Sequence, residues 1–399
     1  MDTSLKNYLT VTGGYWAFTI TDGAIRMLVV LYFHELGYSP LEIAMLFLFY
    51  EFFGVVTNLV GGWIGSRVGL NLTMHIGMLL QVLALLALTV PESWLSVAYV
   101  MAAQALSGIA KDLNKMSAKA SVKLLLPKDA DNADQRLFRW VSVLTGSKNS
   151  LKGAGFFLGG LLLGLIGFRG ALLVLAGSLF VVFILTLWLL PRELGKTTAK
   201  AKIRHIFSKT AQINWLSAAR FFLFGSRDVW FVVGLPVFLY AELNWSHTQV
   251  GSYLALWIIG YGLVQAFTPG LIRKAAPSAS SVSLAAFALA TIPAGIAVAL
   301  SQDWNAQYSI VIGLIVFGII FAINSAIHSF MILAWSDHDK VAMNVGFYYM
   351  ANAGGRLTGT VISGWAYQKY GLSGCLWWSV AFVVLAGLLS LPLMARPAD

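Results

Sequence analysis

The chain has 399 residues, of which 58% are hydrophobic and only 11% are charged, and its mean hydropathy is +0.76. A soluble protein carries charge on about a quarter of its residues, so this composition excludes a soluble globular protein and indicates a helical membrane protein. The single cysteine, Cys375, excludes an internal disulfide and a metal site built from several thiolates.

Apolar stretches long enough to cross a bilayer recur along the whole chain and predict an all-α fold of twelve transmembrane helices. The first six are expected near residues 8–33, 41–63, 72–90, 94–118, 137–166 and 170–190. The second six are expected near residues 213–240, 248–270, 279–300, 306–335, 341–366 and 372–395. The polar start MDTSLKN leads into an apolar stretch too long for a signal-peptide core, so no cleavable signal is predicted.

Residues 191–212 are basic, lack a long apolar run and are predicted to form a cytoplasmic linker. This linker divides the chain into an N-terminal six-helix bundle, 1–190, and a C-terminal six-helix bundle, 213–399. Of the Lys and Arg residues outside the spans, all but Arg169 and Lys369 fall on the side that carries the N-terminus. The positive-inside rule therefore predicts a multi-pass protein of the inner (plasma) membrane with both termini in the cytoplasm. The same asymmetry explains most of the net charge of +10 without a nucleic-acid partner.

The two predicted bundles resemble each other in sequence. Asp22 in the first span corresponds to Asp228 in the seventh, and an offset of 204 residues aligns Lys152 with Arg356. The same offset aligns three glycine pairs: Gly155 with Gly359, Gly160 with Gly364, and Gly170 with Gly374. These matches favour two parallel repeats related by an axis along the membrane normal.

The loop after the second span, GGWIGSRVG, resembles the gating motif of the major facilitator superfamily. Gly62, Arg67 and Gly69 match that motif, whereas Ser66 stands where the motif has an acidic residue. The resemblance implies a gating role for the three matching residues.

The fifth span contains GFFLGG, which is similar to the antiporter motif of the same superfamily, with Phe156 where proline is usual. Gly155, Gly159 and Gly160 have two explanations, a direct role in coupling and close helix packing through small residues. Packing is the preferred explanation.

Ionisable residues lie within the predicted spans, where charge is costly unless it serves a site. Asp22, Glu51, Asp112 and Asp228 are the acids that are candidates for coupling or charge pairing. Bases outnumber acids in these spans, and a cavity with excess cations at low dielectric favours an anion. The candidate substrate-binding residues are Lys148, Lys152, Arg227, Arg356, Arg26, Lys111, Lys115, Arg220 and Asn352.

Spacing along the helices predicts some charge pairs. Asp22 and Arg26 stand i,i+4 and are expected to pair, and Asp112 is expected to pair with one lysine of the fourth span. Arg227 and Asp228 are sequence neighbours, so they are expected to point apart and to seek partners on other helices.

Alternatives remain open for other charges. Lys111 and Lys115 either line the path of an anion or extend into the inner headgroups, and the same two explanations apply to Arg220. Glu51 either carries a proton or pairs with a lysine. Several aromatic residues near these positions are candidates for the lining of the site, namely Tyr15, Trp16, Trp230, Tyr348 and Tyr349.

Long runs in both halves, YWAFTITDGAIRMLV, FLFYEFFGVVTNLVGGW, QALSGIAKDLNKMSAK, LTGSKNSLKGAGFFLGG and AARFFLFGSRDVWFVV, closely resemble ArsJ-type permeases, the organoarsenical efflux members of the major facilitator superfamily. The resemblance implies export of 1-arseno-3-phosphoglycerate, an ester formed when glyceraldehyde-3-phosphate dehydrogenase uses arsenate in place of phosphate. It also implies a functional link to that dehydrogenase and a role in arsenate resistance.

Taken with the basic residues, the resemblance predicts a monomeric transporter without a cofactor that exports a phosphate or arsenate ester by alternating access. The alternative is an exchanger or exporter of another organophosphate or organic anion, with or without proton coupling. A membrane enzyme is disfavoured because the short segments between spans carry no nucleophile–base set, metal cluster or phosphate-binding glycine loop.

Overall fold

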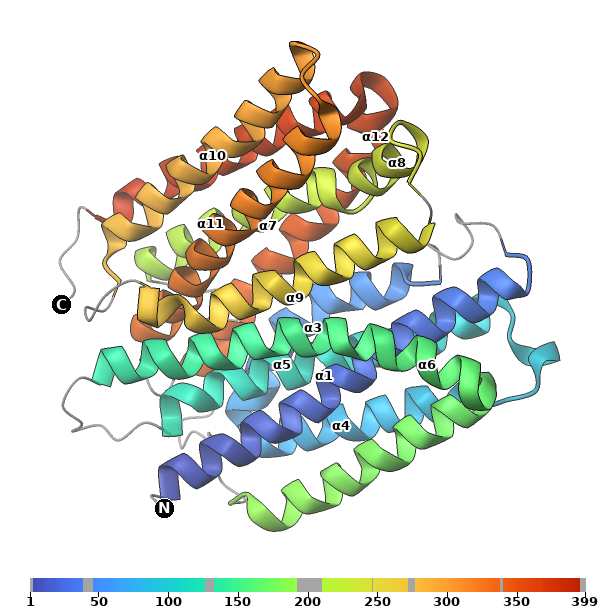
Figure 1. Cartoon of the computed structure of the whole chain (residues 1–399). Helices are drawn as coiled ribbons and strands as arrows, with labels where there is room; N and C mark the ends of the chain where they lie inside the picture. The colour runs from blue at the N-terminus through green and yellow to red at the C-terminus, as the bar shows by residue number, and fades with distance from the viewer. Residues whose placement is uncertain are drawn as a thin grey trace. The chain divides into compact units, whose positions relative to one another are not determined.

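A computed structural model describes residues 3–38, 46–125, 133–191, 210–245, 247–271, 277–337 and 340–394, and these residues contain helices and no β strand (Figure 1). The helices are α1 (Thr3–Glu35), α3 (Leu48–Val68), α4 (Leu70–Ala87), α5 (Val97–Leu125), α6 (Ala133–Leu189), α7 (Ala211–Phe231), α8 (Gly234–Ala241), α9 (His247–Leu271), α10 (Ala279–Ser301), α11 (Ala306–Ala334) and α12 (Val341–Ser390). Short 3₁₀ helices span Glu92–Trp94 and Leu391–Leu393.

Eight of the described helices are long and apolar enough to cross a membrane. Two of them, α6 and α12, have 57 and 50 residues, and each bends at one glycine. Gly167 has φ 71° and Gly371 has φ 61°, a conformation that glycine adopts without steric cost. Each long helix therefore supplies two of the predicted spans, and the two bends stand at the same offset of 204 residues as the sequence repeat.

The boundaries of several predicted spans differ from the structure. The first 5 residues of the span predicted at 41–63 lie outside the described residues, and α3 runs on to Val68, where Gly69 with φ 96° ends it. Helix α5 continues past the predicted end at residue 118 to Leu125 because no proline or glycine interrupts the sequence there. The seventh span breaks between α7 and α8, because Pro236 has no N–H to bond the carbonyl of Val232.

The chain forms two compact units. The first comprises residues 1–133, 147–207 and 336–350, and the second comprises residues 134–146, 208–335 and 351–399. One end of α6 and one end of α12 thus belong to a different unit from the rest of the helix. The predicted bundles 1–190 and 213–399 stay a prediction, and most of the predicted linker lies outside the described residues.

In the first unit, α5 packs against α1, α3 and α4, and glycines bring α1 against α6. A Cβ on Gly155 would lie 2.5 Å from the carbonyl oxygen of Ile20, and one on Gly159 would lie 2.5 Å from that of Ala24. A Cβ on Gly23 would in turn lie 2.5 Å from the carbonyl oxygen of Lys152. The contacts agree with the packing explanation for the glycines of α6.

The second unit repeats this arrangement between α7 and α12. A Cβ on Gly359 would lie 2.5 Å from the carbonyl oxygen of Gly225, and one on Gly355 would overlap the carbonyl of Phe221. Gly359 is the residue that the 204-residue offset aligns with Gly155. The same close helix contact therefore occurs at equivalent positions of both repeats.

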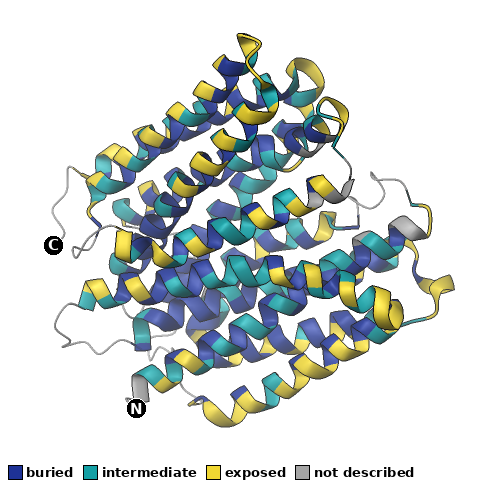
Figure 2. Ribbon diagram, in the orientation of Figure 1, coloured by how far each residue is buried: buried dark blue, intermediate teal, exposed yellow. Residues whose placement is uncertain are grey.

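Many residues on the second segment of α6 are exposed (Figure 2), and apolar residues are among them. Leu173, Val181 and Trp188 on this segment are 53%, 58% and 82% exposed. In a soluble protein such a surface would drive association, whereas in a bilayer it is covered by lipid.

Gly155→Ala is expected to lower the thermal midpoint of the detergent-purified protein, because overpacking a tight contact costs about 1–3 kcal/mol. Gly164→Ala on the same helix is the matched control, since no atom lies within 4 Å of the position its Cβ would take. Equal midpoints for the two variants would contradict the close contact between α1 and α6.

Candidate functional site

The charged residues of the first unit meet where α1 crosses α6. Lys152 on α6 donates from Nζ to Oδ2 of Asp22 on α1 at 2.8 Å, and the hydroxyl of Tyr50 donates to Oδ1 at 2.5 Å. Asp22 is buried, and Gly23 and Gly155 make the helix contact beside it. The glycines allow the two backbones to approach closely, so the ammonium of Lys152 reaches the carboxylate of Asp22.

Arg26 pairs with Glu51 of α3 at 2.9 Å, so the predicted pair between Arg26 and Asp22 is wrong. The i,i+4 spacing made that pair available, but α3 brings a carboxylate from another helix to the guanidinium. Lys111 of α5 lies 3.7 Å from the same glutamate. Glu51 therefore bridges two cations, as the pairing explanation of this residue expected.

Asp112 on α5 is held by two lysines of its own helix. Lys111 lies 3.6 Å from Oδ2, and Lys115 contacts Oδ1, which confirms that this acid pairs with lysine of the fourth span. Both lysine side chains are only 13% exposed. They are thus part of a buried charge cluster, and extension into headgroups does not describe them.

The lysine stripe of α5 continues one turn further than predicted. Lys119, which the sequence placed in the inner loop, is buried within α5 with its Nζ 5.2 Å from the ring centre of Tyr349. Lys115 lies 4.6 Å from the same ring. Lys148, one turn from Lys152 on α6, is partly buried.

In the second unit, Asp228 of α7 takes the place of Asp22. Arg356 of α12 donates from Nε to Oδ2 at 2.9 Å, and Arg227 donates from Nε to Oδ1 at 2.7 Å. The partner on another helix was expected, but Arg227 and Asp228 also pair with each other, contrary to the prediction. The long arginine side chain folds back along the helix, where it lies within 6 Å of the ring centres of Phe224, Phe231 and Phe321.

The two repeats therefore carry equivalent ion pairs. Asp22–Lys152 and Asp228–Arg356 each join the first helix of a repeat to the fifth, beside a glycine contact. The offset of 204 residues that aligned the two bases in the sequence also aligns them in these pairs. The two bases differ in their chemistry. The arginine guanidinium is planar and stays charged in any protein environment, whereas the lysine ammonium is a compact point charge.

Arg220 is buried rather than at an interface. Its Nε donates to Oδ1 of Asn352 at 2.9 Å, and Nη1 donates to the Ser325 hydroxyl at 3.2 Å. Gln265 donates to the same hydroxyl at 3.0 Å, and the guanidinium lies 3.8 Å from the ring centre of Phe224. Asn352 thus contacts a candidate base, and Arg220 belongs to the interior of the second unit.

The residues of the predicted gating motif lie at the junction of α3 and α4. Gly69 forms the turn with its positive φ, and the guanidinium of Arg67 lies 4.6 Å from the ring centre of Trp63. Ser66 donates to the carbonyl of Trp63 at 2.8 Å, so at the acidic position of the motif it caps backbone and carries no charge. Gly62 lies within α3. A gating role for Gly62, Arg67 and Gly69 stays a prediction.

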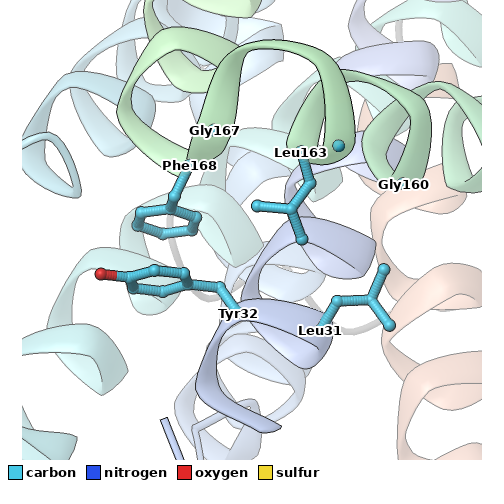
Figure 3. A pocket seen from close by; sticks show the side chains of 7 residues that line it. Leu31, Tyr32, Gly160, Leu163, Gly167 and Phe168 are labelled. Carbon is cyan, nitrogen blue, oxygen red and sulfur yellow. The ribbon is translucent and has the colours of Figure 1, made fainter. Parts of the chain in front are cut away.

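A cavity of about 300 Å³ lies at the outer surface of α1 and α6 in the first unit (Figure 3). Leu31, Leu163 and three glycines line it, and the stacked rings of Tyr32 and Phe168, with centres 4.1 Å apart, form one wall. No charged residue lines this cavity, so it is not a site for an anion.

Sequence reasoning missed two residues of the charge clusters, Tyr50 and Lys119. Tyr50 stands in FLFYEFFG, where its neighbours Phe49 and Phe52 are exposed, and nothing in that run marks one ring as buried. Lys119 shares the i,i+4 spacing of Lys111 and Lys115, and that spacing was the available signal.

Replacing Asp22 by Asn is expected to lower stability by about 3–5 kcal/mol, because it leaves a mostly buried ammonium without its carboxylate. The double variant Asp22→Asn/Lys152→Met is expected to recover part of this loss, since both charges are then absent. Thermal midpoints of the purified variants measure both effects.

Asp337→Asn is the matched control for this pair. Asp337 and Lys340 are 3.1 Å apart but exposed, and such pairs contribute little to stability. A loss in Asp337→Asn as large as that in Asp22→Asn would contradict the assignment.

Comparison with known families agrees with the repeat structure. The sequence profile of the Major Facilitator Superfamily matches the chain twice, over residues 11–234 and 216–398. No curated protein sequence gives a significant match.

Solved structures of similar fold cover nearly the whole chain. A bacterial homologue of the iron transporter ferroportin in an outward-facing state has a TM-score of 0.78 and 17% identity, over 99% of this chain and 100% of that one. The human organic anion transporter MFSD10 (TETRAN) has a TM-score of 0.78 and 15% identity, over 98% of this chain and 100% of that one. The proton:xylose symporter XylE has a TM-score of 0.75 and 14% identity, over 98% of this chain and 96% of that one. These TM-scores show a shared fold, and the predicted fold class is confirmed.

Proposed function

The chain belongs to the major facilitator superfamily and is a membrane transporter rather than an enzyme, and we propose that it exports an organic polyanion. The substrate we propose is 1-arseno-3-phosphoglycerate, which the resemblance to ArsJ-type permeases implies. The observation that carries the proposal is the excess of cations in the ion-pair clusters of the two units, where the four acids Asp22, Glu51, Asp112 and Asp228 face the six bases Arg26, Lys111, Lys115, Lys152, Arg227 and Arg356.

The ion pairs of the two units do not cancel this excess. In the first unit, Lys111 and Arg26 share the carboxylate of Glu51, and Lys111 and Lys115 share that of Asp112. In the second unit, Asp228 faces Arg227 and Arg356 together. The remaining positive charge lies in a low dielectric, where it attracts an anion strongly.

The kinds of base also suit a substrate with phosphate and arsenate groups. The planar guanidinium of arginine binds such groups through two parallel hydrogen bonds, and the lysine ammonium acts as a point charge. The proposed substrate-binding residues are Lys148, Lys152, Arg227, Arg356, Arg26, Lys111, Lys115, Arg220 and Asn352. The acids Asp22, Glu51, Asp112 and Asp228 pair with these bases and supply any proton coupling.

Export follows from the charge of the substrate. An inside-negative potential drives an anion outward by about 2.3 kcal/mol per charge per 100 mV, and alternating access needs no cofactor. The proposal includes a monomer in the inner membrane with both termini in the cytoplasm. It also includes a functional link to glyceraldehyde-3-phosphate dehydrogenase, which forms the ester, and arsenate resistance as the outcome.

Lys152→Ala and Arg356→Ala are each expected to reduce transport about tenfold or more, because each removes a charge-assisted contact to the substrate. The assay uses everted vesicles in a medium that contains the dehydrogenase, glyceraldehyde 3-phosphate, arsenate and NAD⁺, the oxidant with which the dehydrogenase generates the ester. Arsenic that accumulates in the vesicles is measured by mass spectrometry and normalised to folded transporter.

Lys340→Ala is the control for this assay, since its side chain is exposed and pairs only at the surface with Asp337. Undiminished transport in both site variants would remove these two residues from the site. Strong competition by 3-phosphoglycerate would favour the exchanger of ordinary organophosphates, and repeating the assay with and without a proton gradient tests coupling.

A further inference from the structure

Tyr50 of α3 lies at the centre of the charge cluster in the first unit. Its ring is buried, and three cations from three helices surround it: the ring centre is 3.8 Å from Lys111 Nζ, 4.9 Å from the Arg26 guanidinium and 5.9 Å from Lys152 Nζ. Its hydroxyl donates to Asp22 at 2.5 Å. One side chain thus lies close to three cations and donates a hydrogen bond to an acid.

Packing between α3 and α5 fixes the position of this ring. A Cβ on Gly108 of α5 would lie 2.8 Å from the Cα of Tyr50 and would overlap its carbonyl, so the two backbones are in direct contact. One turn along α3, a Cβ on Gly54 would lie 2.7 Å from Oδ2 of Asp112. The same face of α3 therefore presents a ring to the cations and leaves room for the acid that holds Lys111.

An aromatic ring holds cations in a way that a carboxylate does not. The negative face of its quadrupole attracts a cation within about 6 Å, yet the ring carries no net charge and leaves the cation's charge intact. The ring of Tyr50 therefore holds Lys111, Arg26 and Lys152 close together and does not neutralise their charges.

The hydroxyl has a second effect, on Asp22. Because Oδ1 accepts from Tyr50, Asp22 meets Lys152 through Oδ2 alone. Without this hydrogen bond, both carboxylate oxygens would be free to turn toward Lys152 and to screen its charge from a substrate.

We propose that Tyr50 is a positioning residue that sets the selectivity of the site for phosphate or arsenate groups over carboxylates. The proposal rests on the proposed function. Three cations around one ring suit a group with three terminal oxygens and two negative charges, whereas a carboxylate has two oxygens and one charge. The ring therefore favours the phosphate class of substrate.

Two variants separate the roles of the hydroxyl and the ring. Tyr50→Phe keeps the ring and is expected to weaken binding of 3-phosphoglycerate about tenfold through the loss of the hydrogen bond to a charged group. Tyr50→Leu removes the ring as well and is expected to weaken it about a hundredfold. Binding of glycerate, which lacks the phosphate, is expected to change less than twofold in both, so discrimination between the two ligands falls.

Calorimetry on the purified full-length protein measures these affinities, and Tyr253→Phe is the control. Tyr253 is a partly buried tyrosine of α9 in the other unit, where its ring packs edge-on against Trp245 at 5.5 Å. Unchanged 3-phosphoglycerate affinity in Tyr50→Leu, or an equal loss for both ligands, would overturn the proposal.

A second measurement needs no substrate and separates failure of this proposal from failure of the proposed function. Acetylation of individual lysines by a water-soluble anhydride is followed by mass spectrometry. Tyr50→Leu is expected to speed the acetylation of Lys111, because the ring beside its ammonium is lost. Tyr50→Phe is expected to slow the acetylation of Lys152, because both carboxylate oxygens of Asp22 are then free to bind its ammonium. If the wild type binds no phosphate ester but the lysines respond in this way, the proposed substrate class is wrong and Tyr50 still positions the cations. Unchanged lysine reactivity overturns the role of Tyr50.

Discussion

Charges inside a membrane protein have to be paired or hydrogen-bonded, because an isolated ion in a low dielectric is costly. Two ion pairs, Asp22–Lys152 and Asp228–Arg356, meet this requirement at equivalent positions of the two repeats. The helices that carry them touch through glycines, since a side chain at Gly155 or Gly359 would separate the backbones. The packing of each unit and the position of its cations thus depend on the same contact.

Both units gather cations around aromatic rings as well as around acids. Tyr50 does so in the first unit, and Phe224 does so in the second, where it lies close to both Arg220 and Arg227. The difference between the units is chemical: the ring of the first unit has a hydroxyl that engages Asp22, whereas the ring of the second has none. Rings hold cations without cancelling their charge, so the positive potential of each unit is preserved.

The fold itself does not select a substrate. Structures of similar fold include an organic anion transporter and a proton:xylose symporter, so the same helices serve unlike ligands. Selection rests on the side chains that the helices bring together. In each unit these side chains are bases in excess of acids beside aromatic rings, and this combination is the basis of the proposed polyanionic substrate.

The sequence by itself determined the membrane fold, the repeat and the set of charged residues. Hydropathy, offset and spacing depend only on which residue stands at which position, so they can be measured without knowing any contact. Only the tertiary structure decided which charges meet. Arg26 has Asp22 four residues away on its own helix, yet it pairs with Glu51, which the fold brings to the guanidinium from α3. Tyr50 reads like its lipid-facing neighbours in an aromatic run, and its burial depends on the contact of α3 with Gly108. Such contacts depend on which helices lie next to each other, and no local sequence pattern predicts which helices do.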